Sequence, residues 1–186
     1  MEGRFGSFFY STYLGNGLAE SENLSRSQQH KDNNANKGKG GRVGFALSQW
    51  AEVAYSYYKG KYDEENRRDL VLQGVDLVWT ADPVQVLSEY SRAYLENPEN
   101  FGAGKVEGFF IQASFVIDIL QPVFSYQRIR YEDAFHGPGF VSPEVHGGGI
   151  SEKKSRWAVG LTYSISRDVF LKFEYDFNRE KGLELK

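Results

Sequence analysis

Strict alternation of apolar and polar residues marks the C-terminal part of the chain. From 156 to 166, every second residue is apolar: Trp157, Val159, Leu161, Tyr163 and Ile165. After a short turn, the same alternation continues to residue 178 with Val169, Leu171, Phe173, Tyr175 and Phe177. A period of two is typical of β-strands with one apolar face. The segment is therefore predicted to form an antiparallel hairpin.

The same pattern recurs upstream and predicts an all-β protein. Seven further strands are expected, at Arg4–Leu14, Arg42–Ser48, Glu52–Lys59, Asp69–Ala81, Val84–Leu95, Val106–Ile117 and Leu120–Tyr131. Together with the C-terminal hairpin, this makes about nine strands. Aromatic residues make up 16% of the chain, which favours pleated sheets over helices.

The connections between these strands alternate between short and long. Short turns are expected around Gln49 and at residues 82–83, 118–119 and 166–168, whereas longer polar connections span 15–41, 60–67, 96–105 and 132–155. Such alternation is typical of up-and-down barrels in the outer membrane, with short turns at one rim and long external loops at the other. We therefore predict a single domain over 1–186, an antiparallel transmembrane β-barrel or part of one. Its two largest external loops are the polar segment 15–41 and the Gly- and Pro-containing segment 132–155.

Each face of this barrel has its own residues. The lipid-facing set is predicted to comprise Trp157, Val159, Leu161, Tyr163, Val169, Leu171, Phe173, Tyr175 and Phe177. The alternate positions would line a water-filled pore, with Lys172, Glu174, Asp176 and Asn178 as candidates and Glu89 and Gln112 added from other strands. None of the lipid-facing residues is charged, as a bilayer requires, because Lys or Arg at mid-depth costs about 2–4 kcal/mol.

A soluble alternative explains the alternation equally well. A mean hydropathy of −0.53 is that of a soluble protein. The apolar face would then pack inside a soluble β-barrel or β-sandwich, and a Tyr-rich surface would bind a ligand such as a carbohydrate. A barrel hides its apolar residues at alternate positions, so low average hydropathy fits a membrane barrel as well. The sequence alone is therefore compatible with a membrane barrel and with a soluble β-barrel or β-sandwich.

The residues give little support for chemistry or cofactors. The chain has no Cys, and its three His residues lie in expected loops without the spacing of a metal motif. Glu174 and Asp176 share a strand face, as the paired carboxylates of a glycosidase would, but the wall of a polar pore also places carboxylates on one face. The net charge of −3 with no basic stripe argues against nucleic-acid binding. We expect no enzyme activity, no metal and no cofactor.

Several strand sequences resemble the phosphate-selective porin O and P family of Gram-negative bacteria. The resemblance lies in residues 76–79 (DLVW), 88–90 (SEY), 108–114 (GFFIQAS), 120–122 (LQP), 159–163 (VGLTY) and 174–175 (EY). It implies an outer-membrane barrel of about sixteen strands that forms a homotrimer and passes small hydrophilic solutes, anions among them, by passive diffusion. The basic residues of the phosphate-specific members are not recognisable here.

The resemblance also predicts which part of such a barrel the chain represents. Barrels of this family end in a strand with a terminal aromatic residue, whereas residues 178–186 are polar. The first residues lack the basic start and apolar middle of a secretory signal. We therefore expect the chain to be the C-terminal part of the barrel, truncated at both ends.

Overall fold

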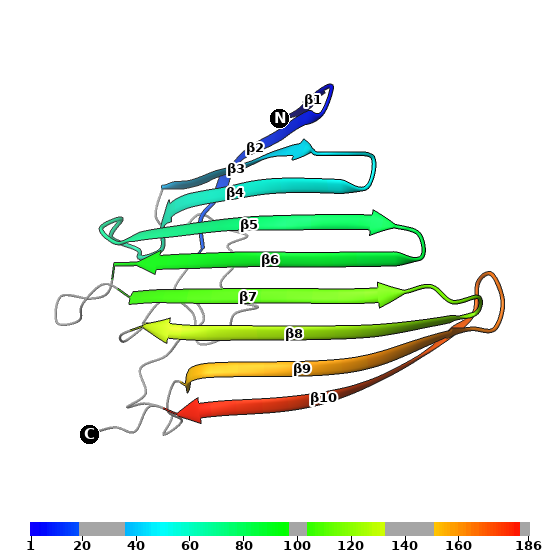
Figure 1. The fold of residues 1–186 in the computed structure, drawn as a ribbon. Coiled ribbons are helices and arrows are strands. Elements are labelled where there is room, and N and C mark those ends of the chain that lie inside the picture. Colours follow the sequence, from blue (N-terminus) through cyan, green and yellow to red (C-terminus); the bar gives the residue numbers. More distant parts are fainter. Residues whose placement is uncertain (19–35, 97–103, 133–150, 183–186) are drawn as a thin grey trace.

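The chain folds into a single antiparallel sheet whose strands follow one another in chain order (Figure 1). The structure is a computed structural model that describes residues 1–18, 36–96, 104–132 and 151–182. The ten strands are β1 (Glu2–Phe5), β2 (Phe8–Asn16), β3 (Lys37–Ala46), β4 (Ala51–Lys61), β5 (Asp69–Ala81), β6 (Val84–Leu95), β7 (Gly104–Phe115), β8 (Leu120–Glu132), β9 (Ser151–Ser164) and β10 (Phe170–Gly182). The all-β, up-and-down fold is thus confirmed.

Short turns join alternate strands at one end of the sheet (Figure 1). They connect β3 to β4, β5 to β6, β7 to β8 and β9 to β10, as the sequence predicted, and a fifth joins β1 to β2. We call this end the turn end and the opposite end the loop end. The sheet is open, with β1 and β10 at its two edges. Within the described residues, no helix is long and apolar enough to cross a membrane.

The strand count is ten because the first expected strand is a hairpin. Gly6 has a φ of 56°, a left-handed conformation that glycine adopts without the steric cost of a Cβ atom. The chain reverses there, and Phe5 pairs with Phe8. The prediction of one strand over Arg4–Leu14 was therefore wrong, since alternation alone does not reveal a tight reversal inside a strand-like segment.

The boundaries of the two large predicted loops were also partly wrong. β3 begins at Lys37, so a glycine-rich stretch assigned to the 15–41 loop is strand. A Cβ atom on Gly38 would lie 2.5 Å from the Tyr58 hydroxyl, and one on Gly40 would lie 2.5 Å from the ring of Tyr13. The glycines are therefore places where aromatic rings cross the backbone, not marks of a loop. Likewise β9 begins at Ser151, inside the predicted 132–155 loop, and most of both loops lies outside the described residues.

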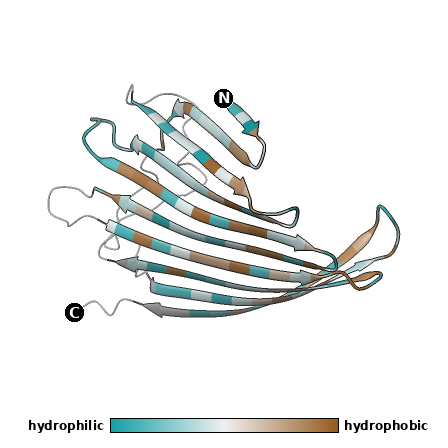
Figure 2. Cartoon of the chain, turned by 45° about the horizontal axis from the view of Figure 1, so that its top comes forward, coloured by the Kyte–Doolittle hydropathy of each residue, from teal (hydrophilic) through white to brown (hydrophobic). Residues whose placement is uncertain are grey.

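The antiparallel register gives the sheet two chemically different faces, and residue colours alternate accordingly along the strands (Figure 2). One row of register partners runs through Phe45, Val53, Leu77, Ser88, Ile111, Tyr126, Trp157 and Phe177. We call this side the apolar face. The next row runs through Asp76, Glu89, Phe110, Gln127, Arg156 and Asn178 on the opposite side, which we call the polar face.

Candidate functional site

The polar face carries all six residues predicted to line a pore. Glu89 and Asn178 lie in one register row, and Gln112 and Asp176 lie in the adjacent row. Lys172 and Glu174 continue the same side of β10 towards the turn end. The sequence thus places residues from three strands on a common face, because the side-chain period of two is kept along every strand.

Ion pairs tie the strands of the polar face together. The Arg42 guanidinium on β3 donates two hydrogen bonds to the Asp76 carboxylate on β5, one of them 2.6 Å long, and so reaches across β4. Arg156 on β9 donates a 3.1 Å hydrogen bond to Asp176 on β10. Because these pairs combine opposite charges, the polar face carries both positive and negative groups.

Two hollows lie side by side on this face. The first, of about 580 Å³, is bordered by Arg42, Ser56, Glu89 and Ser91 among others. The second, of about 540 Å³, is bordered by Glu89, Gln127, Arg156 and Asn178 among others. Glu89 and Asn178 therefore border hollows, whereas Gln112, Lys172, Glu174 and Asp176 lie on the same face outside these two.

The sequence analysis missed two arginines of this face, Arg42 and Arg156. Arg42 was placed at the start of a strand, next to a presumed loop, and was not assigned to either face. Arg156 belongs to the alternating segment, and its even number puts it in phase with Ala158 and Gly160. The strand period alone was sufficient to find Arg156, whereas the partner of Arg42 lies 34 residues away and depends on the register of three strands.

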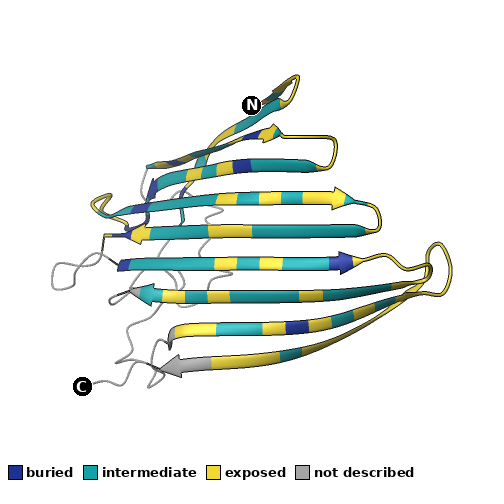
Figure 3. Cartoon of the chain, in the orientation of Figure 1, coloured by how far each residue is buried: buried dark blue, intermediate teal, exposed yellow. Residues whose placement is uncertain are grey.

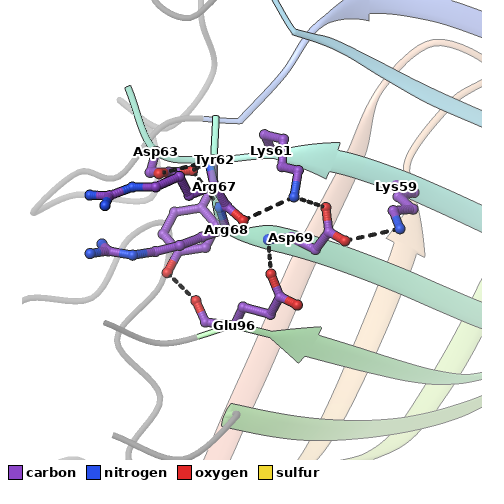
Figure 4. A network of polar contacts seen from close by, with 8 residues as sticks. All are labelled: Lys59, Lys61, Tyr62, Asp63, Arg67, Arg68, Asp69 and Glu96. Carbon is purple, nitrogen blue, oxygen red and sulfur yellow. Dashed lines mark hydrogen bonds and ion pairs between the residues drawn. The ribbon is translucent and has the colours of Figure 1, made fainter. Parts of the chain in front are cut away.

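A compact network of polar contacts lies at the loop end of the sheet (Figure 4). Tyr62 is buried with Leu70 and Leu95, and its hydroxyl donates a 2.6 Å hydrogen bond to the Glu96 carbonyl oxygen. The Asp63 carboxylate accepts hydrogen bonds from the backbone N–H groups of Arg67 and Arg68. We call Tyr62, Leu70 and Leu95 the rim cluster. The predicted polar connection 60–67 is therefore a short structured turn folded against the sheet.

Lysine and glutamate side chains extend this network. Asp69 forms ion pairs with Lys59 at 3.0 Å and with Lys61 at 2.7 Å, and its backbone N–H donates to the Glu96 carboxylate at 2.8 Å. The strand ends of β4, β5 and β6 are thus joined by side chains as well as by the sheet (Figure 4).

Every strand from β3 to β10 has exposed large hydrophobic side chains on the apolar face, and exposed positions alternate with intermediate ones along the strands (Figure 3). All nine residues predicted to face lipid are large hydrophobic side chains with at least 37% of their surface exposed. Phe173 and Tyr175 reach 62% and 65%. The described residues form one sheet and provide no helix or second sheet to cover this face. A continuous apolar surface of this kind marks a contact with lipid or with another protein.

Aromatic residues concentrate near the loop-end border of the apolar face. The rings of Tyr126 and Trp157 lie 4.5 Å apart, and those of Tyr175 and Phe177 lie 4.6 Å apart. One register row further towards the loop end, Arg128, Ser155 and Arg179 replace them on β8, β9 and β10, whereas the same row continues with Tyr90 and Phe109 on β6 and β7. On β8–β10 the apolar surface therefore ends in an aromatic row followed by polar and charged residues, an order that suits a membrane interface.

No group of His, Asp or Glu suited to a metal ion occurs among the residues that the structure describes. His30, His136 and His146 lie outside that part of the chain. The described polar face contains carboxylates, but they are engaged with arginines or spaced along a strand. The arrangement is that of a charged, solvated surface.

Three comparisons with known proteins bear on this geometry. No protein-family model and no curated protein matches the chain. A solved structure described as "structure of porin refined at 1.8 angstroms resolution" is similar, with a TM-score of 0.67 and 8% sequence identity. The similarity covers 95% of this chain and 54% of that porin, so the chain spans about half the length of the porin it matches. The shared feature is the fold, a porin-like antiparallel sheet.

Proposed function

We propose that the chain forms part of the wall of a water-filled channel in a bacterial outer membrane, through which small hydrophilic solutes or ions pass by diffusion. One observation carries the proposal. A single sheet exposes large apolar side chains on one side of every strand from β3 to β10, while the other side presents paired charges around open hollows. A barrel wall between lipid and water needs this division of residues.

The proposed division assigns the faces of the sheet. The apolar face contacts lipid, with Leu161, Leu171 and Phe173 within the hydrocarbon layer. The polar face lines the channel, with Glu89 and Asn178 next to its hollows and Lys172, Glu174 and Asp176 along β10. Each strand from β3 to β10 has ten or more residues, and roughly 9 to 11 tilted residues suffice to cross the hydrocarbon.

The proposed mechanism is passive and includes no enzymatic step. The polar face carries both signs of charge. Its basic residues include Arg42, Arg156 and Lys172, and its acidic residues include Asp76, Glu89, Glu174 and Asp176. Field lines from paired charges cancel over short distances, and we expect weak selectivity between anions and cations. Membership of the phosphate-selective porin family and assembly as a homotrimer stay predictions from the resemblance.

A soluble ligand-binding sheet is not favoured by this geometry. Such a protein has to cover its apolar face with a second layer, because water contact with large side chains is costly. The described residues do not supply that layer. The proposal therefore predicts that the chain requires detergent or lipid to remain dispersed, whereas a soluble protein remains monomeric in plain buffer.

Channel selectivity tests the proposal directly. In planar bilayers containing the protein, the double variant Glu174→Lys and Asp176→Lys is expected to shift the reversal potential under a salt gradient towards anion selectivity. The matched control carries Asp82→Lys and Asp168→Lys, which make the same charge change in the short turns. Absence of ion conductance in the wild-type protein, or equal shifts in both variants, would contradict the proposed channel wall.

A further inference from the structure

The Glu89 carboxylate lies where the hollows of the polar face meet. Glu89 is exposed and borders both hollows described above, as well as a third one of about 340 Å³ that Asp76 and Phe110 also border. A Cβ atom on Gly74 would lie 3.9 Å from the Oε1 atom of Glu89, at an ordinary van der Waals distance. The carboxylate therefore lies beside a residue that has no side chain, and a solute can approach it from the channel side.

Small residues continue this open space across the neighbouring strands. Gly74 on β5, Ser91 on β6 and Gly108 on β7 are successive register partners. They form the row of the polar face next to Glu89 on its loop-end side. A Cβ atom on Gly108 would have only the Ser91 hydroxyl oxygen within 4 Å. We call Gly74, Ser91 and Gly108 the groove, because their small size leaves a shallow channel beside the carboxylate.

The negative charge of Glu89 is not matched by the ion pair next to it. Asp76, the register partner of Glu89, accepts hydrogen bonds from both terminal nitrogens of the Arg42 guanidinium. Arg42 also interacts with Glu89, but only through its charge. Within the described part of the chain, Glu89 takes part in no hydrogen bond or ion pair. Two carboxylates thus share one guanidinium, which leaves one negative charge over.

The surroundings of this carboxylate suit an ammonium group that carries a short alkyl chain. Phe110 is the register partner of Glu89 on β7, and an aromatic ring attracts cations as well as alkyl groups. The Ser91 hydroxyl is able to accept a hydrogen bond from an N–H donor. A Ca²⁺ ion is matched less well, because it takes about six to eight oxygen ligands. Apolar side chains border the first hollow beyond the groove, namely Leu72, Ala93 and Val106.

We infer that Glu89 binds the ammonium group of small organic cations, with their alkyl chain lying along the groove. This inference rests on the proposed channel and names a class of solute that the wall holds during passage. Attraction between opposite charges is stronger in a hollow of the wall than in bulk water, because the effective dielectric constant is lower there. The site adds a local preference to a wall whose other charges are largely paired.

Block of the potassium current by n-butylammonium tests the inference in planar bilayers containing the full chain. The half-blocking concentration is measured for the wild-type protein and for Glu89→Gln, which removes the charge and keeps the size of the side chain. Gly74→Val keeps every charge and fills the space beside the carboxylate. The matched control is Glu174→Gln. Glu174 also takes part in no hydrogen bond or ion pair within the described residues, but it lies outside all three hollows.

The expected result is a half-blocking concentration that rises about tenfold in Glu89→Gln and several-fold in Gly74→Val. The control is expected to stay within about twofold of the wild-type protein, and butyrate, which has the opposite charge, is expected not to block. Absence of block in the wild-type protein, unchanged block in Glu89→Gln or Gly74→Val, or an equal rise in Glu174→Gln overturns the inference, while the measured conductance still supports the channel. A wild-type chain without conductance overturns both proposals.

Discussion

The rim cluster and the β9–β10 hairpin contain similar residue types in opposite environments. Tyr62 and Leu95 in the rim cluster are each 1% exposed, whereas Trp157 and Tyr175 in the hairpin are 60% and 65% exposed. The rim cluster obtains its contacts from the protein itself. The hairpin leaves its apolar side chains exposed, and in the proposed channel wall their contacts come from lipid, so the two regions differ in what stabilises them.

The largest effect is expected in the rim cluster. Tyr62→Ala removes a buried ring, and we expect a loss of about 3–5 kcal/mol in the free energy of unfolding, as for other buried aromatic residues. Urea titration of the protein folded in lipid vesicles measures it. Tyr62→Phe is the control, because it keeps the ring and removes only the hydrogen bond to the Glu96 carbonyl oxygen. Its expected loss in the free energy of unfolding is about 1 kcal/mol. Equal losses in both variants would contradict a packing role for the ring.

A charge on the hairpin is expected to give the next largest effect. Phe173→Arg places a cation on the apolar face, which should cost about 2–4 kcal/mol in the free energy of unfolding from a bilayer. Glu174→Arg introduces the same side chain one residue along the strand, on the polar face, and is expected to cost less than about 1 kcal/mol. Similar costs at both positions in the same vesicle titration would show that lipid does not contact this face.

The Arg42–Asp76 and Arg156–Asp176 ion pairs of the polar face should differ by a smaller amount. Arg42 binds Asp76 through two hydrogen bonds, whereas Arg156 binds Asp176 through one. Double-mutant cycles with Arg→Gln and Asp→Asn are expected to give a coupling free energy of about 1–2 kcal/mol for the first pair and below about 1 kcal/mol for the second. A larger coupling in the hairpin would contradict the view that its strands depend mainly on their surroundings.

The same contrast explains how much of the fold could be predicted from the sequence. β5 and β6 were predicted with the bounds that the structure has, because both strands alternate cleanly and meet at a short turn at Asp82. The glycine-rich start of β3 was missed because its partners, Tyr13 and Tyr58, belong to neighbouring strands. Residues that become strand through contacts with distant rings carry no local signal.

The candidate site follows the same rule. The side of β10 that Lys172, Glu174 and Asp176 share was predictable from alternation within one strand. The pairing of Arg42 with Asp76 was not, because it requires the register of β3, β4 and β5. The buried position of Tyr62 was equally hidden, since its turn contains Asp63, Glu64, Glu65 and Arg67 and has the composition of a solvated loop.

The most direct test measures whether each side chain of β10 contacts lipid or water. The chain has no cysteine, so single Cys variants at positions 172 to 177 carry one nitroxide label each without background. In vesicles, electron paramagnetic resonance should find high oxygen accessibility at positions 173, 175 and 177 and high accessibility to a water-soluble nickel chelate at 172, 174 and 176. Accessibilities that do not alternate, or that alternate in the opposite phase, would contradict a sheet with lipid on its apolar face and water on its polar face.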